Sequence, residues 1–115
     1  MTALEMQTRH GEVCPLDTTL KILAGKWKSI ILCRLKAGEL RFTELLNTLP
    51  GCTRRMLALQ LQELSQDQII IKTVDLTASP IKTSYRLTAL GTSLIPIIQA
   101  MDAWGATYIK TLSSN

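Results

Sequence analysis

Aromatic residues are scarce in this 115-residue sequence, at 4% of the chain, so any core must be built mainly from leucine and isoleucine. Long apolar runs are also missing, since none approaches the ~18 residues needed to cross a bilayer. Residues 1–13 carry charged side chains and lack the apolar centre of a signal peptide. We therefore expect a cytoplasmic protein with no membrane partner.

Cysteine and histidine are few. The three cysteines, Cys14, Cys33 and Cys52, are an odd number without CxxC spacing, which argues against a disulfide framework and a structural zinc site. The one histidine, His10, lies outside the expected core, so neither a Ser-His nor a Cys-His pair is available there. No glycine-rich phosphate loop is present. We expect no enzyme, no metal and no cofactor.

Apolar residues are plentiful, at 46%, which is enough for one compact domain and too many for a disordered chain. Lysine and arginine exceed aspartate and glutamate by 13 to 9, which gives a formal charge of +4. A small basic domain suits a polyanionic partner, although many basic proteins bind none. Charge alone is weak support for nucleic-acid binding.

The apolar periodicity predicts four helices before residue 67. Pro15 suits the first position of one helix, and Thr53 suits the N-cap of another. Pro50 and Gly51 interrupt the helical pattern. Leu40 and Arg41 are expected to form a short extended link. The expected helices cover residues 15–25, 27–36, 42–49 and 54–66, after a flexible N-terminal arm at residues 1–13.

The period changes after residue 68. Residues 69–74 and 83–87 are rich in β-branched side chains and predict two strands joined by a long loop. Thr88 can cap a last helix over residues 89–112, which we expect Pro96 to kink. This order predicts a mainly α fold with a small β-hairpin. It is a winged helix-turn-helix with additional N- and C-terminal dimerisation helices, formed by residues 14–115.

In order over residues 14–108, the chain carries the fragments CPL (14–16), GKW (25–27), RFTEL (41–45), LPG (49–51), ML (56–57), LQEL (61–64), YRLT (85–88) and WG (104–105). On these fragments it resembles the HxlR-type family of winged helix-turn-helix regulators, which has a MarR-like architecture. The resemblance implies a DNA-binding dimer that represses or activates nearby genes, often in response to electrophiles, oxidants or small metabolites. Ala58, Leu59 and Cys52 depart from the usual pattern, which affects the expected base preference.

The predicted helix 54–66 has two different faces. Its leucines at positions 57, 61 and 64 form one apolar stripe. Arginine can pair with guanine and glutamine with adenine in the major groove, while small apolar side chains can meet a thymine methyl. The alternative is that the arginines only solvate an exposed helix. The predicted groove contacts are Thr53, Arg54, Arg55, Ala58, Leu59 and Gln62.

Phosphate contacts need donors without base geometry. Lys26 and Lys28 stand at the start of the second predicted helix, where the helix dipole favours an anion. Arg41 precedes the third helix in the same way, and Lys82 lies on the predicted wing. Each of these four side chains has the alternative of being an ordinary surface charge.

The last helix carries more apolar surface than a small domain covers easily, although such a stripe is often only core. A twofold dimer through the first and last helices would place two recognition helices ~34 Å apart on a pseudo-palindromic operator. Cys14, before Pro15, would lie at a helix N-terminus, where the dipole favours the thiolate. It is the predicted sensor for a small-molecule or electrophile inducer; the alternative is a small packing thiol.

Two functions therefore remain at this stage. The first is a sequence-specific, homodimeric regulator that binds double-stranded DNA as a repressor and responds through Cys14. The second is a winged-helix protein-interaction module without specific DNA binding, whose basic face is merely solvated.

Overall fold

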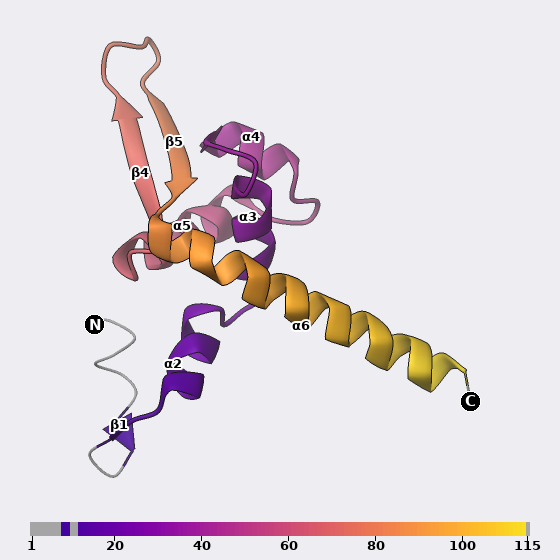
Figure 1. The fold of residues 1–115 in the computed structure, drawn as a ribbon. Coiled ribbons are helices and arrows are strands. Elements are labelled where there is room, and N and C mark those ends of the chain that lie inside the picture. The colour runs from indigo at the N-terminus through magenta and orange to yellow at the C-terminus, as the bar shows by residue number, and fades with distance from the viewer. Residues whose placement is uncertain (1–7, 10–11, 115) are drawn as a thin grey trace.

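The structure is a computed structural model that describes residues 8–9 and 12–114. These residues form five helices and two small antiparallel sheets (Figure 1). The helices are α2 (Pro15–Ile22), α3 (Lys28–Leu35), α4 (Phe42–Asn47), α5 (Arg54–Gln66) and α6 (Ala89–Ser113). The strands are β1 (Thr8–Arg9), β2 (Glu12–Val13), β3 (Leu40–Arg41), β4 (Ile70–Asp75) and β5 (Lys82–Leu87).

The N-terminal segment was predicted to be a flexible arm. Residues 1–7, 10 and 11, including His10, lie outside the described residues. The described part pairs β1 with β2, with Thr8 opposite Val13. Flexibility of residues 1–13 thus stays a prediction.

The larger sheet has the strand order β3-β5-β4, with all pairs antiparallel. Strands β4 and β5 form the predicted hairpin, with Ile70 opposite Leu87 at its base and Asp75 opposite Lys82 near its tip. The expected extended link at Leu40–Arg41 is itself a strand, paired with the outer edge of β5. The hairpin projects from the helices as a wing (Figure 1).

The core confirms the prediction from aromatic scarcity. Leucine and isoleucine supply all of its buried apolar side chains except Trp27 and Tyr85. Most of them lie on α3, α4, α5, the base of the hairpin and the first half of α6, while Leu23, Trp27 and Leu49 come from the connecting segments. The fold is the predicted winged helix-turn-helix: mostly helical, with a three-stranded antiparallel sheet.

Helix α6 begins where predicted, because the Thr88 side-chain oxygen accepts a hydrogen bond from the Gly91 amide at 3.0 Å. Pro96 lies inside α6 and does not end it. The second half of the helix extends away from the other elements toward the C-terminus (Figure 1).

Helix α2 has no buried residue, although it is amphipathic in sequence. Its leucines, Leu16 and Leu20, are exposed. The Cα radius of gyration is 16.2 Å, above the ~13 Å expected for a compact chain of this length. Among the described residues, no helix has the length and hydropathy needed to span a membrane.

Candidate nucleic-acid interface

Helices α4 and α5 form the helix-turn-helix, and the turn between them is set by local chemistry. Gly51 has a φ of +86°, a conformation that favours glycine. Thr53 then caps α5, because its hydroxyl oxygen accepts a hydrogen bond from the Met56 amide at 3.1 Å. The predicted N-cap is confirmed.

Helix α5 separates its two faces as the sequence predicted. Leu57, Leu61 and Leu64 are buried in the core. The opposite face is exposed, and Leu59 keeps 51% of its surface accessible although it is apolar. The structure therefore places all the predicted groove residues on one free surface: Thr53, Arg54, Arg55, Ala58, Leu59 and Gln62.

Arg54 is partly positioned by its neighbour in α4. Its guanidinium carbon lies 5.9 Å from the centroid of the Phe42 ring, within the range of a cation–π contact. Such a contact restricts the side chain near the N-terminus of α5 while leaving its hydrogen-bond donors free.

Two cationic side chains from distant parts of the chain lie at the same hollow beside α4. Arg41 and Lys82 line the same hollow of about 380 Å³, between the start of α4 and the wing. Thr43 and Thr83 add hydroxyl groups to its wall. The Arg41 amide donates a hydrogen bond to Glu44 Oε1 at 2.8 Å, which leaves the guanidinium out of the cap.

Lys28 is a correction to the predicted phosphate contacts. It is buried, and its Nζ lies 2.6 Å from Glu63 Oε2 on α5. An ammonium enclosed in this way joins α3 to α5 and is not presented to an external phosphate. Lys26, two residues earlier, is exposed and has its Nζ 4.8 Å from the Trp27 ring centroid.

A further cation lies beside the recognition face. Lys72 on β4 lines a hollow of about 430 Å³ together with Ala58 and Gln62 of α5 and Tyr85 of β5. Burial raises the pKa of the Tyr85 hydroxyl. Lys72 was missed because a lysine in a strand pattern carries no signal that its strand packs beside a helix.

The wing loop is held by one carboxylate. Asp75 Oδ1 accepts hydrogen bonds from the Thr77 hydroxyl at 2.6 Å and from the Thr77 amide at 3.0 Å. These bonds favour the ionised form and lower the pKa of Asp75.

The three cysteines are free and half-buried. Cys14 is the N-cap residue of α2, followed by Pro15 at the first helical position as predicted, and it makes no side-chain cap hydrogen bond. Burial raises the pKa of the Cys52 thiol, an effect that the charge of Lys26 partly offsets. No group of three or more metal-ligating side chains is found in the part of the chain that the structure describes.

Residues 22–113 match the family described as HxlR-like helix-turn-helix. The chain belongs to this family. Over 97 residues it is 45% identical to YdeP of Bacillus subtilis, an HTH-type transcriptional regulator, covering 84% of this chain and 75% of YdeP. It is therefore an HTH-type transcriptional regulator and not an enzyme.

Solved structures agree. The redox regulator HypR in its reduced form superposes with a TM-score of 0.80 at 38% identity, covering 89% of this chain and all of HypR. The reduced form of the transcriptional regulator YodB from B. subtilis superposes with a TM-score of 0.70 at 36% identity, covering 81% and 91%. Both support the winged helix-turn-helix fold.

Proposed function

We propose that this regulator is a homodimer that binds double-stranded DNA sequence-specifically and represses transcription. One observation carries the proposal. The face of α5 opposite its buried leucines is free, and it carries two arginines and a glutamine beside two exposed apolar side chains.

The exposed face of α5 fits the major groove. Arg55 and Gln62 have the donors needed for guanine and adenine edges, while Ala58 and Leu59 can only contact a thymine methyl. The phosphate backbone on either side is contacted by Lys26, by Arg41 and Lys82 in their shared hollow, and by Lys72.

Dimerisation is supported by surface that nothing in the described chain covers. Helix α2 has no buried residue. The second half of α6 leaves large apolar side chains exposed: Met101, Trp104, Tyr108, Ile109 and Leu112. Pairing these helices with those of a second copy would align two α5 helices for half-sites ~34 Å apart, which requires a pseudo-palindromic operator.

Cys14 is the proposed sensor. It is the N-cap of α2, one of the helices proposed to form the dimer, so modification of its thiol would alter that interface. HypR, a redox regulator by name, supports a response of this kind. If an electrophile or oxidant releases the wild-type protein from DNA, Cys14→Ser should abolish the response and Cys33→Ser should not. An intact response in Cys14→Ser would remove Cys14 from this role.

The deciding experiment is selection of bound fragments from genomic DNA, followed by binding measurements with three variants. Arg55→Ala should weaken operator binding by about 1–3 kcal/mol and relax the preference at one base pair. Lys82→Ala should weaken binding to all sequences alike and reduce the slope of log K against log salt by about 0.9.

Lys36→Ala is the matched control, because Lys36 is an exposed lysine after α3 and lies outside the proposed interface. The Lys36→Ala variant should leave the slope of log K against log salt unchanged. Absence of enriched fragments, together with salt-insensitive retention on DNA-cellulose, would favour a protein-interaction module instead.

A further inference from the structure

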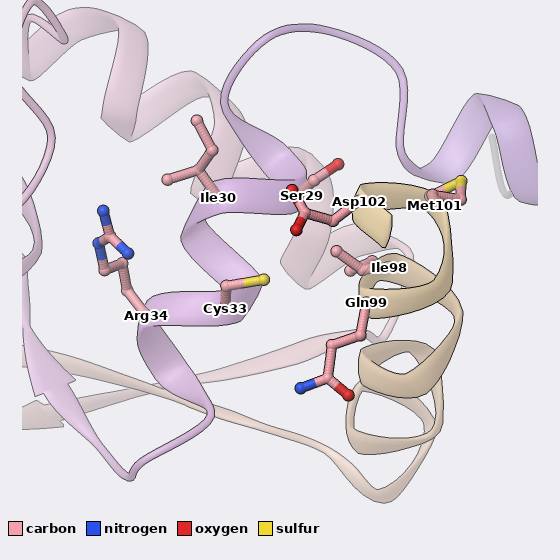
Figure 2. Close-up of a pocket in the computed structure, with 8 residues that line it drawn as sticks. All are labelled: Ser29, Ile30, Cys33, Arg34, Ile98, Gln99, Met101 and Asp102. Carbon is pink, nitrogen blue, oxygen red and sulfur yellow. The ribbon is translucent and has the colours of Figure 1, made fainter. Parts of the chain in front are cut away.

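A third hollow lies between α3 and α6. Its volume is about 580 Å³, which is within the ~300–1,000 Å³ typical of small-molecule sites. Figure 2 shows side chains of both helices around it. The hollow therefore lies between α3, which belongs to the DNA-binding unit, and α6, which is proposed to form the dimer.

One part of the wall of this hollow is apolar and contains two sulfur atoms, while Ser29 and Gln99 add polar groups. Ile30 and Cys33 come from α3, and Ile98 and Met101 come from α6. Ile98 is buried, whereas Met101 is exposed at the mouth. Thioether and thiol sulfur are polarisable and contact aromatic rings favourably, so the wall suits a flat aromatic body.

Two charged side chains, Arg34 and the exposed Asp102, line this hollow. Figure 2 shows its carboxylate directed from α6 toward α3, on the side to which the Cys33 thiol points, while the Arg34 guanidinium points away. Among residues 8–9 and 12–114, no hydrogen bond or ion pair engages the Asp102 carboxylate. The Asp102 carboxylate thus makes no ion pair, although Arg34 lines the same hollow and the formal charge of the protein is +4.

We propose that this hollow binds a small aromatic cation, with its ring system against Ile30, Ile98 and Met101 and its positive charge beside Asp102. Charge selects the ligand class, because an anion would meet the Asp102 carboxylate at close range. A neutral ring system would leave that carboxylate partly desolvated and unpaired.

Occupancy of the hollow does not depend on DNA, but its regulatory effect rests on the proposed function. Lys28, the first residue of α3, forms an ion pair with Glu63 of α5, which links α3 directly to the recognition helix. A cation held between α3 and α6 would restrict the orientation of the recognition helix relative to the dimer helices and thereby change operator affinity.

The test uses the full chain and rhodamine 6G, a fluorescent aromatic cation, with binding followed by anisotropy in the absence of DNA. Asp102→Asn should weaken binding about tenfold, the size of one charge-assisted contact. Asp102→Glu keeps the charge and should bind nearly as the wild type does. Glu39→Gln, which removes the same charge from an exposed loop position, should leave binding unchanged.

Three results would overturn the proposal. Equal dye binding by wild type and Asp102→Asn would show that the carboxylate plays no part. Binding of the anionic dye fluorescein as tight as that of rhodamine 6G would show that the charge of the ligand does not matter. Dye binding too weak to detect, with altered sedimentation of Asp102→Asn, would identify the hollow as a face between copies. Because these measurements contain no DNA, their failure is distinct from failure of operator binding.

Discussion

Lys28 is buried and forms an ion pair, although its position at the start of α3 suggested a contact with a DNA phosphate. The residue stands in the first turn of α3, where a lysine is well placed for phosphate. Its side chain is only 6% exposed because the recognition helix packs over it and offers the Glu63 carboxylate. A buried ammonium is tolerated only with such a partner.

Removing either partner of this ion pair should therefore have unequal effects. Glu63→Ala leaves the Lys28 ammonium buried and unpaired, and it should lower the free energy of unfolding by about 1–3 kcal/mol. The Glu63 side chain is 41% exposed, which places the loss toward the lower end. Lys28→Met removes the charge but keeps an apolar stem, so its loss should be smaller. Urea denaturation measures both, and a larger loss for Lys28→Met would contradict this account.

Asp75 makes the wing sensitive to acid. The Thr77 hydrogen bonds lower the pKa of Asp75 in the folded protein, below its ordinary value of about 3.9. Their contribution is fully present above the ordinary pKa and is lost as pH falls through the lowered value.

An NMR titration of the Thr77 amide should therefore show a midpoint below the ordinary aspartate range. In the Asp75→Asn variant that transition should disappear. A wild-type midpoint at or above 3.9 would mean that the two hydrogen bonds do not persist in solution.

At the scale of elements, the junction between β4 and α6 depends on close backbone approach. The Ile69 carbonyl oxygen accepts hydrogen bonds from the Thr88 amide and hydroxyl, each at 3.0 Å. This arrangement brings the first turn of α6 so near that a Cβ on Gly91 would overlap that carbonyl.

Two glycines of the same helix should consequently respond in opposite ways to alanine. Gly91→Ala forces β4 and α6 apart and should destabilise the protein by at least about 1–3 kcal/mol. Gly105 has no atom within 4 Å of its would-be Cβ, so Gly105→Ala should stabilise α6 by about 0.5–1 kcal/mol through helix propensity. Thermal unfolding of the two variants provides the comparison, and equal effects would refute it.

At the scale of the whole molecule, the described chain leaves α2 and half of α6 without a core of their own. Trp104 stacks on Tyr108, with ring centroids 5.3 Å apart. In a monomer both side chains would be exposed to solvent within a long apolar stripe on α6. Exposed apolar surface of this extent is characteristic of an interface.

The proposed dimer can be tested by replacing each of two exposed leucines with glutamate in separate variants. Leu16 on α2 is 67% exposed, and Leu76 at the wing tip is 76% exposed. Leu16→Glu should shift the sedimentation equilibrium toward monomer and weaken binding to a two-half-site operator more than to a single half-site. Leu76→Glu should leave the association state unchanged. Dimers of undiminished stability in Leu16→Glu would place the interface elsewhere.

Local patterns were enough to predict most elements and one face of the candidate site. The leucine stripe of α5, the Thr53 cap and the β-branched hairpin are encoded within a few residues, since helix and strand periodicities act over that range. The winged helix-turn-helix and the exposed recognition residues follow from them, with only small shifts at element ends. The kink predicted at Pro96 stays a prediction, since the structure shows only that α6 continues through this residue.

The sequence by itself thus determined the order of elements, the leucine and isoleucine core and the division of α5 into a buried and a free face. Tertiary structure alone decided that Arg41 and Lys82 share one hollow, that the Lys28 side chain is buried against Glu63, and that Asp102 lies at a hollow shared with α3. Each of these pairings joins segments far apart along the chain. Which side chains meet across such a distance depends on how helices and strands pack against one another, and no local periodicity contains that information.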